Sequence, residues 1–305
     1  MSKVHVVTDS ASTITPEIAQ RLNITVVPLK VRIDPHAGLL DRLRSPQTKT
    51  SKIYQDGAEL DHEELLLQMG SERVHPTVIG PTASDFRRVY KKLSQRTDQI
   101  ISLHSSASLS PVCLEAHKAA REFMGRCDIA VMNSETLSLG LSILVREATE
   151  LAAQSLPLPD IMREIRGIVR RIYIVLVTDT MDYLEHSGLI SPTQAILGSM
   201  LGIRPFLAME EGQIIPMEKV RGQDKAIDKL ADFADEFTYI EQIAILQSTS
   251  YPTDKTKMLK DQLESIAPNL KDLPTLLYGP LLASHIGPDG TGLVVFEGKE
   301  PKLAF

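Results

Sequence analysis

The chain has 305 residues, of which 43% are hydrophobic and 24% charged, and its formal net charge is −6. These values are ordinary for a globular protein and allow a large core divided between two domains. The acidic balance argues against nucleic acid or an anionic membrane as the main partner. Cys113 and Cys127 fit neither a disulfide framework nor a zinc spacing, which indicates reduced thiols in a cytoplasmic protein.

The first predicted element is a strand over residues 4–7 that runs into a polar turn formed by Thr8, Asp9 and Ser10. Thr15 and Pro16 then begin a helix, because a hydroxyl N-cap followed by proline favours a helix N-terminus. In open α/β sheets the ligand binds at such strand ends. Because this turn carries hydroxyls and a carboxylate in place of glycines, it does not suit a dinucleotide pyrophosphate.

Strand and helix signals continue to alternate up to about residue 155. A β-branched strand at 24–27 precedes an alternating one at 29–33, and residues 34–53 are predicted to form a surface loop. Asp61 caps a short helix, and another helix begins near Ser84. Strands at 100–103 and 129–132 each lead through a polar loop into a helix, the second covering 139–154. This order predicts a parallel sheet covered by helices.

The stretch 156–159 has the composition of a linker, so we predict an N-terminal α/β domain over 1–157 and a second α/β domain with a mixed sheet over 158–305. The segment near 54–75 is expected to pack with the second domain. A helix after Ser191 is predicted to turn Ala195, Ile196 and Met200 inward, and Glu211-Gly212 indicates a hairpin. Further helices and strands complete this domain.

No common nucleotide, hydrolase or metal motif is present, so no metal and no cofactor is expected. Gly287, Gly290 and Gly292 resemble a phosphate loop only superficially, and a hairpin turn before the last strand is the better interpretation. The start of the chain lacks the apolar run of a signal peptide. The longest uncharged run, 186–203, contains several polar residues, so no integral membrane segment is predicted.

A cluster of serines precedes the helix opened by Pro111: Ser105, Ser106, Ser108 and Ser110. Serines in this position are commonly turn formers, and Ser110 is the expected N-cap. The alternative function is anion capture, because hydroxyls and the free N–H groups of a first helical turn can grip a carboxylate or phosphate. His285 could supply a cation or a proton donor at the same cleft.

These residues carry a resemblance to the DegV family. The similarity covers nearly the whole chain in the right order, apart from the loop at 34–53. Its motifs are residues 6–10, 24–29, 54–57, 106–116, 178–184, 188–191, 203–206, 219–221 and 285–288. The resemblance implies a two-domain α/β protein that binds one long-chain fatty acid, with its carboxyl group at the domain interface and its acyl chain in an apolar tunnel. It also implies a binding subunit that presents the fatty acid to a separate fatty-acid kinase and has no catalytic residue of its own.

The resemblance places Thr8, Asp9, Ser10, Ser106, Ser110 and His285 at the ligand site. At two positions the chain departs from the family. Val78 stands where the family has the threonine whose hydroxyl binds the carboxyl group. Leu189 stands where the family has an arginine that serves the kinase reaction, and neighbouring His186 or Arg221 would have to supply the missing positive charge.

Two alternatives remain open from the residues alone. One is a hydrolase that uses Ser106 or Ser110 as nucleophile and His285 as base, which requires them within hydrogen-bond reach. The other is a binder of an uncharged apolar ligand such as an ester or alcohol, which would suit Val78 and Leu189.

Overall fold

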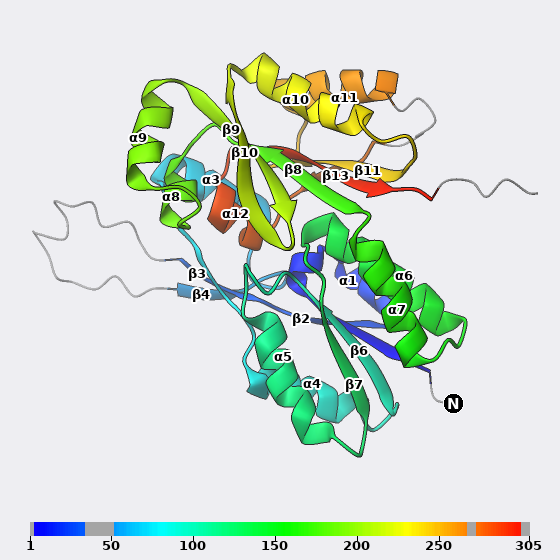
Figure 1. The fold of residues 1–305 in the computed structure, drawn as a ribbon. Helices are drawn as coiled ribbons and strands as arrows, with labels where there is room; N and C mark the ends of the chain where they lie inside the picture. The colour runs from blue at the N-terminus through cyan, green and yellow to red at the C-terminus, as the bar shows by residue number, and fades with distance from the viewer. Residues whose placement is uncertain (1–2, 34–51, 267–272, 300–305) are drawn as a thin grey trace, which may run out of the picture.

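A parallel four-stranded sheet organises the N-terminal half of the computed structural model, which describes residues 3–33, 52–266 and 273–299 (Figure 1). Its strands are β1 (His5–Asp9), β2 (Ile24–Val27), β6 (Gln99–His104) and β7 (Asp128–Asn133), in the order β2-β1-β6-β7. All three neighbouring pairs are parallel. The parallel sheet predicted from the alternation of strands and helices is therefore confirmed.

Helices cover both faces of this sheet. On one face lie α1 (Pro16–Leu22), α6 (Ser138–Ala153) and α7 (Leu158–Val169), which pack with Val6 and Ile101. On the other lie α4 (Ala83–Leu93), α5 (Val112–Ala120) and the short η2 (Arg121–Phe123), which pack with Val7 and Ile100. Neighbouring residues of one strand thus serve opposite faces, as the two-residue period of a strand requires.

Local signals begin these helices where the sequence predicts. Thr15 accepts a hydrogen bond from the Ile18 amide ahead of Pro16, and Asp61 caps α3 (His62–Glu72) through two amides. Thr82 and Asp85 form a reciprocal capping box at the start of α4. These caps satisfy amides that have no partner within their own helix.

A small antiparallel sheet lies beside the first one. It contains β3 (Lys30–Ile33), β4 (Lys52–Gln55) and β5 (Thr77–Ile79), in the order β4-β3-β5. The predicted strand at 29–33 is thus present, although it does not join the parallel sheet. Most of the predicted surface loop, residues 34–51, lies outside the described residues.

The second large sheet is mixed. Its strands are β8 (Ile172–Val177), β9 (Ile203–Glu210), β10 (Gln213–Arg221), β11 (Ile240–Gln247), β12 (Thr275–Leu277) and β13 (Thr291–Glu297). Their order is β10-β9-β8-β13-β11-β12, and only the β11–β12 pair is parallel. The predicted two-part α/β fold with a parallel and a mixed sheet is confirmed.

This second sheet also has two covered faces (Figure 1). One packs against α10 (Gln223–Asp235) and α11 (Asp254–Ile266). The other packs against α3, α8 (Asp182–His186) and α12 (Pro280–Ile286), and we call this second set of buried residues the lipid-side cluster, after the ligand that the sequence leads us to expect. It includes Leu66, Leu184, Leu207, Leu246, Leu282 and Ile286.

Two helices, α7 and α3, pack against the part of the chain on the other side of the predicted domain boundary. Helix α7, which begins at Leu158, places Ile161 and Ile165 in the core of the first sheet. Helix α3, from the 54–75 segment, contributes Leu65 and Met69 to the lipid-side cluster. The division between residues 157 and 158 remains a prediction, because these contacts tie each part of the chain to the other.

Two sequence-based expectations in this half are wrong. In α9 (Pro192–Met200), Ala195 is buried as predicted, but Ile196 is 61% exposed and Met200 78% exposed. The glycines at 287 and 290 do not form a hairpin turn, because the turn joins helix α12 to β13. In the described ranges, no helix is both long and apolar enough to cross a membrane.

Candidate functional site

The polar turns predicted at strand ends meet at one edge of the first sheet. Because β1, β6 and β7 are parallel neighbours, their carboxyl ends lie together at this edge. Thr8, Asp9, Ser105 and Ser106 are all inaccessible to solvent there. Buried polar groups of this kind require hydrogen-bond partners, so their partners define what the edge can do.

The Asp9 carboxylate is fully engaged inside the protein. Its oxygens accept hydrogen bonds from the Ala11 amide at 3.0 Å, the Ser105 amide at 2.9 Å and the Ser105 hydroxyl at 3.2 Å. The Nδ1 atom of His104 lies 3.1 Å from the same carboxylate. Asp9 therefore fixes the position of the serine-rich loop and has no free oxygen directed at a ligand.

Behind Asp9 runs a buried chain of polar side chains. The Ser102 hydroxyl lies 2.7 Å from Nε2 of His104 and 2.8 Å from the Tyr90 hydroxyl. Burial raises the pKa of Tyr90, so its hydroxyl stays protonated and can donate to Ser102. This chain leads into the core and stabilises the sheet end.

Ser10 connects the first sheet to the small one. Its hydroxyl donates to Asp56 at 2.6 Å and accepts from the Leu29 amide at 3.0 Å. The other oxygen of Asp56 lies 2.6 Å from Nε2 of His62, the first residue of α3. Ser10 is thus occupied by structural contacts.

The Ser106 hydroxyl makes a contact across the two domains. It donates to the Gly212 carbonyl at 2.6 Å and accepts from the Ser108 amide at 3.2 Å. Gly212 lies at the tip of the β9–β10 hairpin with φ of +79°, and a Cβ there would come within 2.4 Å of the Ser106 oxygen. Only glycine allows the hairpin to approach Ser106 this closely.

Ser138 Oγ at the start of α6 has no partner among the described residues, and the same is true of two hydroxyls on β1 and on the serine-rich loop, Thr8 Oγ1 and Ser110 Oγ. The expectation that Ser110 caps the next helix is wrong. Helix α5 begins at Val112 with Pro111 at its N-cap and no side-chain cap, while the Ser110 amide bonds the Ser106 carbonyl. Since an unpaired buried hydroxyl costs free energy, these two are the best candidates to contact a bound ligand.

His285 lies on α12 with a defined orientation. Its Nδ1 atom is 2.8 Å from the Leu281 carbonyl and 3.2 Å from the Ser284 hydroxyl. A carbonyl can only accept, so Nδ1 carries a proton and Nε2 of the neutral ring is the acceptor. Burial lowers the pKa of His285, which favours this neutral form.

The serine-rich loop touches both apolar cores. Leu109 packs against the lipid-side cluster and also against the cluster beneath α4 and α5. Helix α12 does the same, because Leu281 belongs to the first-domain cluster and Leu282 to the lipid-side cluster. The unpaired hydroxyls and His285 are therefore carried by segments that border the same apolar region.

The two positions that depart from the family pattern, Val78 and Leu189, lie on different segments of the chain, and so do the two residues expected to supply the missing positive charge, His186 and Arg221. Val78 is half-buried in β5, where it pairs with Val31 of β3. Leu189 is half-buried against the lipid-side cluster, and its amide bonds the Leu184 carbonyl. Arg221 is exposed at the end of β10. His186 stacks 4.4 Å from the ring of His75.

The serine–histidine pair considered from the sequence is not formed among the described residues. Neither Ser106 nor Ser110 is hydrogen-bonded to His285 in the described residues. Burial, with a smaller contribution from Asp9, raises the pKa of Cys113 to about 12, so its thiol is not a nucleophile. Within these ranges no group of three or more potential metal ligands is assembled.

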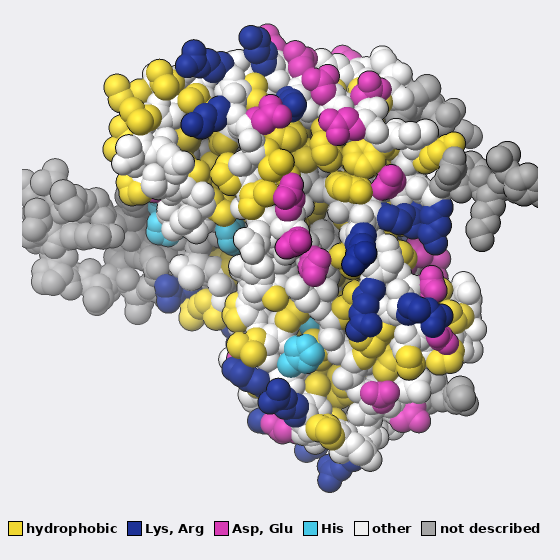
Figure 2. Space-filling model, in the orientation of Figure 1, with side chains coloured by type: hydrophobic (Ala, Val, Ile, Leu, Met, Phe, Trp, Pro, Cys, Tyr) yellow, Lys and Arg dark blue, Asp and Glu magenta, His cyan; other side chains and the backbone are white. Residues whose placement is uncertain are grey.

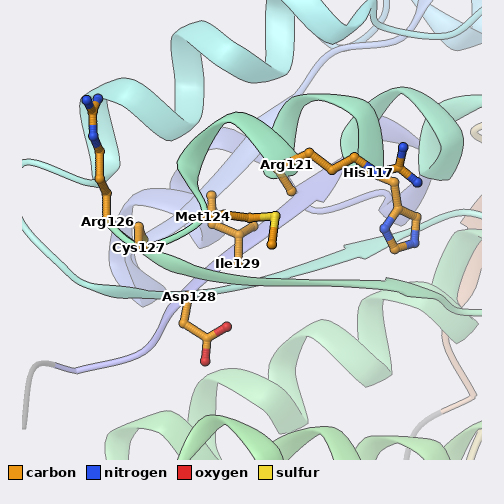
Figure 3. A pocket seen from close by; sticks show the side chains of 9 residues that line it. His117, Arg121, Met124, Arg126, Cys127, Asp128 and Ile129 are labelled. Atoms are coloured by element: carbon orange, nitrogen blue, oxygen red, sulfur yellow. The ribbon is translucent and has the colours of Figure 1, made fainter.

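A separate surface pocket of about 590 Å³ lies at the opposite end of α5 (Figure 3). His117 and Arg121 lie near each other on the helix, and Asp128 and Ile129 line it from β7. None of the site residues predicted from the sequence lines it.

Four residues that hold the site together were not identified from the sequence: Asp56, His62, His104 and Gly212. The Asp-Gly pair at 56–57 was visible as a family motif, but nothing local connects it to Ser10, which is 46 residues away. Gly212 was interpreted only as a hairpin glycine, and its contact with Ser106 spans 106 residues.

Comparison with known proteins agrees with this architecture. A family model described as an uncharacterised protein of the DegV family matches residues 3–42 and 48–298. A DegV domain-containing protein from Deinococcus radiodurans is 28% identical over 297 residues, covering 96% of this chain and 98% of the relative. Another from Caldanaerobacter subterraneus subsp. tengcongensis is 29% identical over 302 residues, covering 98% and 100%.

Solved structures show the same fold. A DegV family protein from Thermus thermophilus, described as fatty acid binding, has a TM-score of 0.77 and 28% identity, covering 97% of this chain and 100% of its own. A fatty acid binding DegV family protein from Streptococcus agalactiae has a TM-score of 0.80 and 22% identity, with coverage of 98% and 100%.

Proposed function

Because the chain belongs to the DegV family, we propose that it binds one long-chain fatty acid or a related lipid at the boundary of its two domains. The observation that carries the proposal is the position of two unpaired buried hydroxyls, Thr8 near the end of β1 and Ser110 in the serine-rich loop, which borders the lipid-side cluster through Leu109. The fatty-acid-binding relative from Thermus thermophilus, similar over nearly the full length, supports it.

In this proposal the acyl chain enters between the mixed sheet and helices α3, α8 and α12. The side chains of that region are leucine, isoleucine, methionine and tyrosine, which suit an apolar ligand. Burying some fifteen methylenes contributes on the order of 10 kcal/mol before ordering costs, at about 0.8 kcal/mol each. Apolar contact is therefore the main source of affinity.

The head group is proposed to contact Ser110, Thr8, Ser106 and His285. Asp9 and Ser10 act indirectly, because their oxygens already hold the loops that carry these groups. A hydrogen bond to a charged group adds only about 1.5–3 kcal/mol, so the head-group contacts set selectivity more than affinity. The valine at 78 removes one such contact.

We propose further that the bound lipid is presented to a partner kinase in the cytoplasm. Phosphoryl transfer requires positive charge against the developing negative charge, and Leu189 cannot supply it. The chain should therefore support acyl-phosphate formation poorly with its kinase. Leu189→Arg is expected to raise turnover, and an unchanged rate would contradict this reasoning.

The decisive experiment is lipid extraction from the purified protein followed by mass spectrometry. A fatty acid present in near-equal amount to the protein is the expected result. If none is found, titration with palmitic and stearic acid should still show saturable binding. A protein that is empty and also rejects both acids would overturn the proposal.

A second candidate is an uncharged lipid that carries a hydroxyl, such as a fatty alcohol. The neutral His285 ring offers Nε2 as an acceptor, which matches a hydroxyl donor better than a carboxylate. Comparing the Kd values of stearic acid, stearyl alcohol and methyl stearate separates the two candidates. Hydrolysis is not favoured, because the serine–histidine pair it requires is not formed.

A further inference from the structure

A second groove lies on the opposite face of the mixed sheet from the lipid-side cluster. It has a volume of about 970 Å³ and lies between strands β8–β10 and helix α10. Val175 and Phe206 face this side, whereas their chain neighbours Ile174 and Leu207 face the lipid-side cluster. The strand alternation thus places most of the groove on the face opposite the lipid-side cluster, while Ile174 and Met209 of that cluster also line it.

Three aromatic rings form part of the wall of this groove, beside polar and charged side chains. Phe233 of α10 lies 6.4 Å from the rings of both Tyr173 and Phe206. Met217 projects from β10 at the border and is 50% exposed. Figure 2 shows hydrophobic side chains gathered between the hairpin and α10, with acidic side chains around them. Exposed apolar grooves with a polar border are typical of interaction sites.

The border is predominantly negative. Carboxylates come from the first domain, the hairpin and α10: Glu135, Glu210, Glu211, Glu218 and Glu236. Arg170 and Lys229 are the cations that line it, and Lys229 is already paired with Glu218 at 2.9 Å. A fatty-acid carboxylate would be repelled here, so the groove is unsuited to the ligand proposed for the other face.

We propose that this groove binds a basic amphipathic helix of a partner protein. Apolar side chains of that helix would rest on Tyr173, Phe233 and Met217, and its lysines or arginines would pair with the surrounding carboxylates. The charge favours a helix over a small cationic amphiphile, because the carboxylates come from three separate elements. A helix presents several cations spaced one turn apart, whereas a small amphiphile offers one.

The test uses the full chain and a fluorescent synthetic peptide of about five helical turns, built from leucine and lysine in an amphipathic order. Fluorescence anisotropy is expected to show saturable binding. A peptide with glutamate in place of lysine should bind at least tenfold more weakly. Failure of the leucine–lysine peptide to bind, or equal binding of both peptides, would overturn the proposal.

Matched variants distinguish the groove from the general acidity of the protein. Met217→Lys places a cation at the border of the groove, whereas Met124→Lys places one at an 80%-exposed site of the first domain. Both change the net charge equally, and both sites tolerate the change because they are exposed. Met217→Lys should raise the Kd about tenfold and Met124→Lys by less than about twofold. Equal effects of the two would contradict the proposal.

Discussion

The strand-end edge of the first sheet and the lipid-side cluster of the second sheet differ in the kind of contact their atoms make. At the edge, almost every polar group has a fixed partner, as Asp9 and Ser10 show. In the cluster, residues such as Leu184 and Leu282 make only non-directional apolar contacts. The groups at the edge therefore hold fixed positions, whereas the contacts in the cluster have no required direction.

This difference teaches where selectivity and affinity reside. In the proposed function, the head group is recognised by a small number of atoms, Thr8 Oγ1, Ser110 Oγ and His285 Nε2. A non-directional site supplies free energy in proportion to the area it buries. The four predictions below test this division, from the largest expected effect to the smallest.

Asp9→Ala should produce the largest loss of stability. It would leave the Ser105 amide and hydroxyl and the Ala11 amide without an acceptor in a buried place. The free energy of unfolding, measured by urea denaturation, should fall by about 3–5 kcal/mol. Asp254→Ala, at a 93%-exposed side chain, should change it by less than about 0.5 kcal/mol. Similar values for both would mean that Asp9 does not organise the edge.

Leu184→Ala should lower stability by about 2–5 kcal/mol, because Leu184 is fully buried in the lipid-side cluster. Ile196→Ala on α9, 61% exposed, is the matched control and should have little effect. If a fatty acid occupies the cluster, saturation with stearic acid should recover part of the loss in Leu184→Ala, since the ligand stabilises the folded state. If stearic acid does not raise the stability of Leu184→Ala, the fatty acid does not bind in the lipid-side cluster.

Fatty-acid affinity should rise as the pH falls. Burial lowers the pKa of His285, so its ring is neutral in the empty protein at neutral pH. A carboxylate can only accept, so a hydrogen bond from Nε2 requires the ring to gain a proton on binding. One proton taken up corresponds to a Kd that falls by up to tenfold for each unit by which the pH falls, in the range above the lowered pKa of the ring.

Methyl stearate and the His285→Gln variant are the controls for this pH dependence. The ester carries no negative charge that would favour the protonated ring, and glutamine does not titrate. The Kd of methyl stearate for the protein, and that of stearic acid for His285→Gln, should therefore change little with pH. A sloping profile for the variant would assign the proton to another group.

The smallest effect is expected for Ser110→Ala in the empty protein. Because the Ser110 hydroxyl has no partner there, its removal should change the free energy of unfolding by less than about 0.5 kcal/mol. Ser106→Ala should cost about 1 kcal/mol, since it breaks the bond to Gly212. With stearic acid the order should reverse, and Ser110→Ala should weaken binding more than it weakens folding. An unchanged Kd would remove Ser110 from the site.

Much of the fold was predictable because its signals are local. Alternating strands and helices predicted the parallel sheet, and Glu211-Gly212 predicted the β9–β10 hairpin, whose turn residues both have positive φ. The inward orientation of Ile196 and Met200 was wrong because the uncharged sequence of α9 has apolar residues on more than one face. Hydrophobic periodicity does not show which face of a helix points to the core when apolar and polar residues are not on separate faces.

The site was less predictable because its contacts are long-range. The sequence placed Ser106 and Ser110 correctly in one polar loop. It also predicted Ser110 as the N-cap of the next helix, whereas the N-cap residue of α5 is Pro111 and has no side-chain cap. Whether a serine is engaged depends on Gly212 and Asp56, which lie on other elements. No local pattern encodes those distances.

If the proposed head group accepts the Ser106 proton, the contact between Ser106 and Gly212 would link ligand binding to the position of the β9–β10 hairpin. A hydroxyl has a single proton, so Ser106 cannot donate to the hairpin and to a head group at once. A ligand that takes this proton leaves the Gly212 carbonyl unpaired and the hairpin tip free to reposition. Met209, Glu210 and Glu211 of the same hairpin line the groove between β8–β10 and α10. The protein with a bound lipid and the empty protein would therefore present different surfaces to a helix in that groove.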